Sequence, residues 1–518
     1  MKKIVIGALG EDVHAAGIHC FSMLAREEGY EVVNLGSAIP IAVMLDTVEK
    51  ENPDLIAISY RLNREGAFQI LRQFLFDLEE RELRKNRRFV FGGTQETCQV
   101  ARELDLFEEI FDGSENEIKT RMYLRASKEE IHELQHPQSL RERVDWKSPY
   151  PLIRHHIGLD SLEETIIEVE KLAESELLDI ISLAPDQNCQ QYYFEPEKMD
   201  RAQDGAGGAP IRTEDDWKRL FQATRRGNFP LVRSYAGTNQ LDRFVELHHR
   251  ILNNAWSAIP ITWYSDLDRR SERPLEEAIE ENLRAIQKAV SLGVPVETNE
   301  SHQWALRYCD DVTEIVTAYM GAFLAKQMGV KEYVQQMMLM TPPKLSPKMD
   351  LAKQIAKMMW IESLEDKNFR IYRMIRTGLL SCPADENLAK GNLIFQMSYG
   401  MALKPDIVHV VAFCEAKRRA RADEILESVL MVDQAVLLAN RGLPDPMCDP
   451  EVKERVEELL DQGEKIFRKI RAIGPLHEPN TLVEAIKQGI LDAPALKGFS
   501  FAQGKVETVI EEGKCVRL

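Results

Sequence analysis

The sequence predicts an α/β protein built from two domains in succession. Apolar stretches of strand length alternate with amphipathic stretches of helix length along most of the 518 residues. Many strand stretches are apolar almost throughout, as in parallel sheets that carry helices on both faces. A polar stretch at 126–151, which contains three prolines, interrupts this alternation. We therefore expect a first domain at 1–135, a linker at 136–160 and a second domain with a C-terminal extension at 161–518.

Composition and charge narrow the class of protein. The chain is 44% apolar and 29% charged, as is ordinary for a globular protein. Its net charge of −18 argues against a nucleic-acid partner, because phosphate contacts need a basic surface. The eight cysteines show no zinc-binding spacing and are interpreted as reduced thiols. No signal-peptide pattern and no apolar run of membrane-spanning length is found, so we expect a cytoplasmic protein without a membrane partner.

The first domain is predicted to be a doubly wound, Rossmann-like parallel sheet. Its predicted strands lie at 3–9, 31–36, 54–60, 88–93 and 109–111. Its main predicted helices lie at 17–28, 39–51 and 65–83. Ligands bind such sheets at the carboxyl ends of the strands, where the polar or glycine-rich loops 10–17, 59–63 and 92–94 fall.

The loop 10–17 carries an acid and an imidazole between two glycines. Asp12 stands two residues before His14, and Gly10 and Gly17 frame the loop. An aspartate so placed can hold the imidazole in one tautomer and raise its basicity as a metal ligand. For these residues alone, the alternative is an ordinary loop with a surface histidine.

In their order and spacing, three loops resemble the cobalamin-binding domain of B12 enzymes over about the first 120 residues. That family carries Asp-x-His-x-x-Gly after the first strand, Ser-x-Leu after a later strand and Gly-Gly after the fourth. The matching residues here are Asp12, His14, Gly17, Ser59, Gly92 and Gly93. One departure is Arg61 at the leucine position, with Leu62 one residue further on. The spacing is most similar to that of the small subunit of glutamate mutase.

This resemblance implies a role for each of these residues. His14 would be the lower axial ligand of cobalt, displacing the nucleotide base of the cofactor, and Asp12 would hold the imidazole. The displaced nucleotide tail would lie between Ser59 and the Gly92–Gly93 pair. The expected cofactor-binding set also includes Gly17, Leu62 and Thr94. A flavodoxin-like or receiver domain without cobalamin is the alternative.

The second domain repeats the strand–helix pattern often enough to predict a TIM-type (β/α)8 barrel. Its predicted strands lie at 177–184, 230–235, 258–264, 294–297, 332–340, 369–380 and 407–413. A second open, doubly wound sheet is the alternative. The barrel is also supported by a looser resemblance to the large subunit of glutamate mutase, from about Leu183 to about Gly498. That resemblance is carried by the stretches 205–208, 230–233, 296–298 and 485–494.

Polar residues at the predicted strand ends are the candidate catalytic residues, because barrel active sites lie there. Arg233 could hold a carboxylate through paired guanidinium donors, and Glu297 could accept from an amino or hydroxyl group. Arg273 is a third candidate, from a basic cluster whose alternative is a solvated loop; for Arg233 the alternative is a strand-end salt bridge. Glu415 resembles a family acid that contacts the adenosyl group. His302 and Trp304 are interpreted as part of a lid or as structural residues.

Together these resemblances imply an adenosylcobalamin-dependent radical isomerase, or mutase, with both subunit types fused in one chain. Its small, carboxylate-bearing substrate would undergo a 1,2-rearrangement. Two departures argue that this substrate is not necessarily glutamate: Asp204 replaces a family arginine and Val411 a family lysine. The alternatives are a corrinoid-dependent methyltransferase and a non-catalytic cobalamin sensor. A predicted strand already at Lys3 favours the mutase, because the methyltransferases place a helical cap first. We expect a homodimer, with a reactivating chaperone as a candidate partner.

Overall fold

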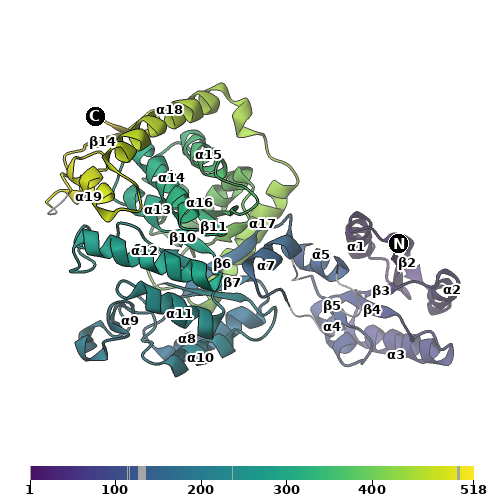
Figure 1. The fold of residues 1–518 in the computed structure, drawn as a ribbon. Coiled ribbons are helices and arrows are strands. Elements are labelled where there is room, and N and C mark those ends of the chain that lie inside the picture. The colour runs from purple at the N-terminus through teal and green to yellow at the C-terminus, as the bar shows by residue number, and fades with distance from the viewer. Residues whose placement is uncertain (1, 114, 116, 126–135, 236, 499–501) are drawn as a thin grey trace. The chain divides into compact units, whose positions relative to one another are not determined.

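The computed structural model describes every residue except 1, 114, 116, 126–135, 236 and 499–501 (Figure 1). The chain separates into two compact units, Met1–Gln135 (unit 1) and His136–Leu518 (unit 2). The predicted boundary at residue 135 falls at the end of a segment that lies outside the described residues. Of the helices that the structure describes, none has the length and apolar character needed to cross a membrane.

Unit 1 is built on a five-stranded parallel sheet of order β2–β1–β3–β4–β5, which confirms the predicted flavodoxin-like fold. The strands are β1 (Lys3–Leu9), β2 (Glu31–Ile39), β3 (Leu55–Tyr60), β4 (Arg88–Gly93) and β5 (Glu109–Phe111). The direction in which strands are added reverses between β1 and β3. In open α/β sheets the ligand site lies at this reversal, outside the carboxyl ends of the strands.

Helices cover both faces of this sheet, which explains why its strands are apolar almost throughout. The helices are α1 (Ala16–Glu27), α2 (Ile41–Glu51), α3 (Arg64–Glu80), α4 (Gln95–Arg102) and α5 (Glu117–Arg125). Alternate strand residues belong to two apolar clusters. Val5 packs in the cluster that contains side chains of α2, α3 and α4. Ile4 and Ile6 pack in the cluster that contains side chains of α1 and α5.

Unit 2 is a (β/α)8 barrel, as predicted. Eight parallel strands are hydrogen-bonded in the order β8–β7–β6–β13–β12–β11–β10–β9, and a bridge between Tyr235 and Ala258 joins the two edges. The strands are β6 (Leu152–Ile157), β7 (Ile180–Leu183), β8 (Leu231–Ser234), β9 (Ser257–Ile259), β10 (Val296–Thr298), β11 (Glu332–Met338), β12 (Arg370–Arg376) and β13 (Ile407–His409).

The helices of unit 2 follow the strands in turn. The barrel helices are α8 (Leu162–Glu174), α10 (Glu214–Ala223), α11 (Leu241–Leu252), α12 (Leu275–Leu292), α14 (Asp311–Gln327), α15 (Pro347–Glu362), α16 (Glu386–Gly400) and α17 (Ala422–Asn440). Additional elements are α7 (Leu140–Lys147), α9 (Gln187–Tyr192), α13 (Glu300–Ala305), α18 (Pro450–Ile473), α19 (Pro479–Lys487), β14 (Thr508–Glu511) and β15 (Lys514–Arg517).

The predicted linker at 136–160 is wrong, because it contains α7 and the first barrel strand, β6. Leu140 and Val144 of α7 pack against the first residues of several strands, among them Leu152, and so fill the amino end of the barrel. The sequence pattern concealed β6 because three of its six residues are Arg154, His155 and His156. Such a run has no apolar character, yet Arg154 and His155 are buried in the folded barrel.

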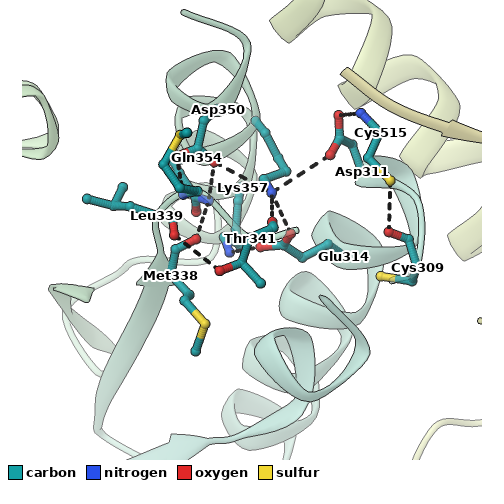
Figure 2. Close-up of polar contacts among 12 residues, drawn as sticks. Cys309, Asp311, Glu314, Met338, Leu339, Thr341, Asp350, Gln354, Lys357 and Cys515 are labelled. Carbon is teal, nitrogen blue, oxygen red and sulfur yellow. Dashed lines mark hydrogen bonds and ion pairs between the residues drawn. The ribbon is translucent and has the colours of Figure 1, made fainter. Parts of the chain in front are cut away.

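A cluster of buried charged groups lies between α14 and α15 (Figure 2). Glu314 Oε2 is 2.8 Å from Lys353 Nζ, and Glu314 Oε1 is 2.6 Å from Lys357 Nζ. Asp311 Oδ1 is 3.7 Å from Lys353 Nζ, and Asp311 Oδ2 accepts a hydrogen bond of 3.1 Å from the backbone N–H of Cys515 on β15. None of the four charged side chains is more than 1% exposed. The cluster therefore attaches the C-terminal hairpin to the helix layer of the barrel.

Candidate functional site

Asp12 and His14 form a hydrogen-bonded pair at the carboxyl end of β1. Asp12 is fully buried, and its Oδ1 lies 2.7 Å from His14 Nδ1 and accepts the His14 backbone N–H at 3.0 Å. A carboxylate at Nδ1 assigns the proton to that nitrogen and leaves Nε2 as an acceptor. The His14 side chain is 55% exposed, and Nε2 forms no hydrogen bond or ion pair with a described residue. This arrangement fits a histidine that binds a metal through Nε2 while a carboxylate orients its ring.

The second oxygen of Asp12 joins two loops of the sheet edge. Asp12 Oδ2 accepts a hydrogen bond of 2.8 Å from the backbone N–H of Arg61, just past β3. Any residue except proline could donate this bond, so the change from leucine to arginine at position 61 leaves it intact. The departure from the family pattern therefore does not disturb the Asp12–His14 pair.

A cavity of about 230 Å³ lies beside this pair and collects four of the predicted residues. Gly17, Ser59, Gly92 and Gly93 all line it. Most of the remaining lining is apolar and includes the rings of Phe21 and Phe111. The cavity thus lies between α1 and the carboxyl half of the sheet, and its shape and character suit a largely apolar group.

The glycines around this cavity have two different functions. A Cβ atom at Gly17 would meet no atom within 4 Å, and one at Gly92 would come no closer than 3.9 Å to another atom. These two glycines therefore keep the cavity open. At Gly93, by contrast, a Cβ atom would lie 2.2 Å from Thr97 Oγ1. Gly93 is required by the packing of β4 against α4.

Two predicted cofactor-binding residues lie outside the lining of the cavity. Leu62 is 41% exposed at its position after β3, and it is Arg61 that lines the cavity. The Thr94 side chain caps the first turn of α4 and pairs reciprocally with Thr97. Thr94 therefore has a structural function in the loop after β4.

In unit 2 the structure brings Arg233 and Glu297 together inside the barrel. Arg233 on β8 is 2% exposed and Glu297 on β10 is 1% exposed, with Arg233 Nη2 3.3 Å from Glu297 Oε2. Trp256 Nε1 donates a hydrogen bond of 2.7 Å to the same oxygen. The Nε atom of Arg233 is buried without a partner among the described residues. The pair is therefore held in place while one guanidinium donor remains available.

The barrel lumen contains three further polar residues that were not identified as site candidates from the sequence: Arg154, His156 and His409. Arg154 Nε donates a hydrogen bond of 2.7 Å to Ser182 Oγ, and Arg154 Nη2 lies 2.7 Å from His156 Nε2. His156 Nδ1 lies 3.1 Å from His409 Nε2. The apolar residues Ile153 and Ile157, which lie on the opposite face from Arg154 and His156, were the signal that could have revealed a strand here.

The two lumen histidines are held in the neutral form. Burial and the positive charge of Arg154 place the pKa of His156 well below its usual range, and Arg233 adds to this effect. Burial and the charge of Arg154 lower the pKa of His409 in the same way, with a further contribution from Arg376. The positive charge of the lumen therefore comes from its arginines.

A second cavity, of about 410 Å³, opens at the carboxyl ends of the barrel strands. His156, Tyr235, Arg376 and Glu415 all line it. Glu415 Oε1 lies 3.1 Å from His155 Nε2. Although burial opposes it, this contact and the charge of Arg376 hold the pKa of Glu415 below its usual value. We call this space the mouth cavity.

Arg273, His302 and Trp304 lie elsewhere. Arg273 Nη1 is 2.9 Å from Glu281 Oε1 on α12, and its Nη2 donates a hydrogen bond of 2.8 Å to the Tyr264 carbonyl. Arg273 therefore fastens a loop to α12 and does not line the mouth cavity. His302 and Trp304 are only 4% and 0% exposed, within the short helix α13. They are packed in the interior and form no exposed lid.

Comparison with known families bears on unit 1. Residues 2–117 match the family model of the B12 binding domain. The chain contains a B12-binding domain. The match covers the Asp12–His14 pair and the cavity beside it, so the geometry and the family agree on a cobalamin site in unit 1.

Two curated relatives align with parts of the chain. Methionine synthase of Mycobacterium tuberculosis is 29% identical over 111 residues, which are 21% of this chain and 9% of that protein. The glutamate mutase sigma subunit of Fusobacterium nucleatum is 36% identical over 58 residues, which are 11% of this chain and 43% of that subunit. The chain thus spans less than half of either relative, and both likenesses are distant.

Among solved structures, a cobalamin-binding protein of Desulfitobacterium hafniense is 26% identical. The similarity covers 21% of this chain and 52% of that chain, with a TM-score of 0.19.

Proposed function

We propose that the protein is an adenosylcobalamin-dependent radical isomerase that rearranges a small, carboxylate-bearing substrate, not necessarily glutamate. The observation that carries the proposal is the Asp12–His14 pair, whose exposed imidazole leaves Nε2 available beside an apolar cavity. The same chain supplies a barrel whose lumen holds buried arginines and a carboxylate. When bound, adenosylcobalamin supplies the radical chemistry, while the protein binds, orients and shields the substrate.

The residues of unit 1 have distinct tasks in this proposal. His14 would hold cobalt through Nε2, and Asp12 would keep Nδ1 protonated so that the ring cannot adopt the other tautomer. The cavity lined by Gly17, Ser59 and Gly92 would take the displaced nucleotide tail. Each of these residues fits the group, because the metal donor is exposed and the cavity is apolar.

The residues of unit 2 would hold the substrate. Arg233 offers its unpartnered Nε to a substrate carboxylate, and Glu297 fixes the guanidinium from the other side. Glu415 at the mouth cavity would contact the adenosyl group. The barrel wall excludes water from the reacting carbon atoms, which protects a radical from side reactions.

A corrinoid-dependent methyltransferase is the second candidate function. The likeness to methionine synthase over 111 residues favours it, because that alignment is longer than the one with the mutase subunit. In that reaction the barrel would bind a methyl donor or acceptor, and no hydrogen atom would be abstracted from the substrate.

The cofactor assignment can be tested by absorption spectroscopy of the purified protein with adenosylcobalamin. The wild type should bind it with the base-off spectrum that follows displacement of the nucleotide base. His14→Ala should weaken binding about tenfold or more, or restore the base-on spectrum. His19→Ala removes an exposed imidazole from the adjoining helix and should change neither property. An unchanged spectrum and affinity in His14→Ala would contradict the assignment.

The reaction class can be tested with a panel of small carboxylic acids under anaerobic conditions. A mutase should give a substrate-dependent radical signal in electron paramagnetic resonance, and Glu297→Gln should lower that signal. Methyl transfer from methylcobalamin without a radical signal would favour the second candidate. Cobalamin binding without either reaction would indicate a non-catalytic cobalamin-binding protein.

A further inference from the structure

The mouth cavity lies where TIM barrels commonly bind phosphate groups. Counted from β6, β12 and β13 are the seventh and eighth strands, and the loops after these two strands form such sites in many barrels. Arg376 is the last residue of β12, in register with His409 of β13. Lys417 lies in the loop after β13, and both residues line the mouth cavity.

The charged groups of Arg376 and Lys417 have no direct partner in the described part of the chain. Among the residues that the structure describes, neither side chain makes an ion pair or a hydrogen bond, and Arg376 Nε is buried without a partner. Their neighbours differ: Arg418 Nη1 is 2.6 Å from Glu424 Oε1, and Arg419 Nη1 is 3.3 Å from Asp160 Oδ2. All three residues line the cavity, so Lys417 differs from Arg418 and Arg419 in having no carboxylate partner among the described residues.

The carboxylate that lines the same cavity does not supply the missing partner. Glu415 Oε1 is already 3.1 Å from His155 Nε2, and it accepts the backbone N–H of Ala412 at 3.4 Å. No oxygen of Glu415 lies within ion-pair distance of Arg376 or Lys417. An adenosyl group, which is uncharged, would also leave these two cations without a counter-charge.

We propose that Arg376 and Lys417 form a binding subsite for an oxyanion at the mouth of the barrel. A guanidinium can bind a carboxylate or a phosphate through two parallel hydrogen bonds, and an ammonium group adds a point charge. This inference rests on the proposed function and specifies its substrate: besides the group held by Arg233, the substrate carries a second anionic group, a carboxylate or a phosphate.

The subsite is distinct from the deeper polar residues of the lumen. Arg154 has Ser182, His156 and His409 as direct partners, and Arg233 is paired with Glu297. Arg376 and Lys417 are the cations that face the cavity with free donors, so an anion that enters the barrel meets them first. A carboxylate and a phosphate would both satisfy these donors, and the experiment below distinguishes the two.

The test is calorimetric titration of the full-length protein at low ionic strength with inorganic phosphate and, separately, with succinate. One of the two anions should bind saturably. Arg376→Gln should weaken that binding about tenfold, and Lys417→Gln should weaken it about threefold. Tighter binding of phosphate identifies a phosphorylated substrate, and tighter binding of succinate identifies a second carboxylate.

Two matched variants make the test specific. Lys367→Gln removes the same charge from the opposite end of β12, where Lys367 is exposed, and should leave binding within twofold of the wild type. Arg376→Lys keeps the charge but loses the paired donors, so it should bind less tightly than the wild type and more tightly than Arg376→Gln. Arg376→Lys also serves if Arg376→Gln fails to fold, which circular dichroism would show.

The inference is overturned if neither anion binds saturably below about 10 mM, a weak affinity even for a single small ion. It is also overturned if Arg376→Lys and Lys417→Gln bind the anion as tightly as the wild type does. Base-off binding of adenosylcobalamin, measured on the same samples, separates the two proposals. Normal cobalamin binding without an anion effect contradicts the subsite alone, whereas anion binding without cobalamin binding contradicts the proposed cofactor.

Discussion

At the scale of single residues, Asp12 determines the chemistry of the loop after β1. One of its oxygens holds His14 Nδ1 and the other holds the backbone of Arg61. Asp12 is fully buried, so these hydrogen bonds hold its carboxylate in one position. The tautomer and the orientation of the imidazole therefore depend on a residue that would not itself touch the metal.

Asp12→Asn should weaken cobalamin binding while preserving the fold. An amide NH2 group cannot accept the two hydrogen bonds that one carboxylate oxygen now accepts, so the His14 ring loses its fixed tautomer. We expect the dissociation constant for cobalamin to rise about 10- to 100-fold, measured by spectroscopic titration. Glu11→Gln, which neutralises an exposed neighbour, is the control. Equal affinities in the two variants would argue against the assigned role of Asp12.

His248 on α11 should make the barrel sensitive to acid. It is 1% exposed, and burial, together with the charge of Arg233, lowers its pKa to about 3. The unfolded chain takes up a proton near pH 6.5, whereas the folded chain does so only near pH 3. The stabilising effect of neutral His248 is therefore complete above pH 6.5 and is lost as the pH falls, by about 1.4 kcal/mol per pH unit.

His248→Phe should remove this contribution, since phenylalanine can pack against Trp217 and Phe244 without titrating. Urea unfolding of unit 2 at pH 7.5, 6.0 and 5.0 should show that the free energy of unfolding falls less steeply with decreasing pH in the variant than in the wild type. The difference in slope should correspond to about one proton taken up on unfolding. Parallel pH dependences would show that the buried imidazole does not stay neutral.

At the scale of elements, α1 and β4 enclose the cavity of unit 1 through residues without side chains. Gly17 and Gly92 leave open space where a Cβ atom would stand, whereas Gly93 is in contact with its neighbours. The same residue type therefore leaves the cavity open at two positions and permits close packing at a third.

Gly92→Val should fill part of the cavity without disturbing the strand, because valine suits β4 and its Cβ atom meets open space. Binding of cobalamin should weaken about tenfold, while cobinamide, which lacks the nucleotide tail, should bind as it does to the wild type. Gly93→Ala should instead lower the unfolding temperature, because its Cβ atom meets Thr97 Oγ1. Equal weakening of both corrinoids by Gly92→Val would contradict a tail-binding cavity.

The pair of helices α14 and α15 depends on the buried charge cluster. Glu314 contacts both Lys353 and Lys357, and it is the ion-pair partner of Lys357 among the described residues (Figure 2). Glu314→Gln should reduce the free energy of unfolding by about 3–5 kcal/mol, because it leaves a buried ammonium group without a counter-charge.

Chemical denaturation followed by circular dichroism measures this loss. Glu276→Gln, an exposed substitution in the first turn of α12, should change the free energy of unfolding by no more than about 0.5 kcal/mol. A Glu314→Gln variant as stable as this control would show that the cluster is not needed for stability.

At the scale of the whole molecule, the two candidate sites lie in different units. The Asp12–His14 pair and the cavity beside it are built entirely from unit 1, and the polar lumen is built entirely from unit 2. Each unit also has its own apolar core. Cofactor binding should therefore be separable from substrate binding.

A fragment of residues 1–135 should fold and bind cobalamin in the base-off form, because every described residue of that site lies within it. We expect its affinity to be within about tenfold of the value for the full chain, measured by the same spectroscopic titration. A folded fragment that binds no cobalamin, beside a full chain that does, would show that unit 2 completes the cofactor site.

Much of unit 1 could be predicted from the sequence because its site obeys local rules. Asp12 and His14 are two residues apart, so one loop brings them together. Ser59 and Gly92 are distant in sequence, but each stands at the carboxyl end of a parallel strand, and such ends meet at one edge of a sheet. Leu62 and Thr94 occupy the same loops, yet the path of the backbone turns them away from the cavity.

By itself, the sequence determined the two α/β folds, the place of the Asp12–His14 loop in a B12-binding domain and the candidacy of Arg233 and Glu297. Only the tertiary structure revealed β6, the buried Arg154 and His156, and the free cations Arg376 and Lys417 at the mouth. The reason is physical. The lumen of a barrel is enclosed by strands that are far apart in the sequence, so the side chains that bury a polar residue there are not its neighbours in the chain. Those distant side chains also determine whether a charged group has a partner. Only the tertiary structure could therefore show which cations of the barrel are available to bind a ligand.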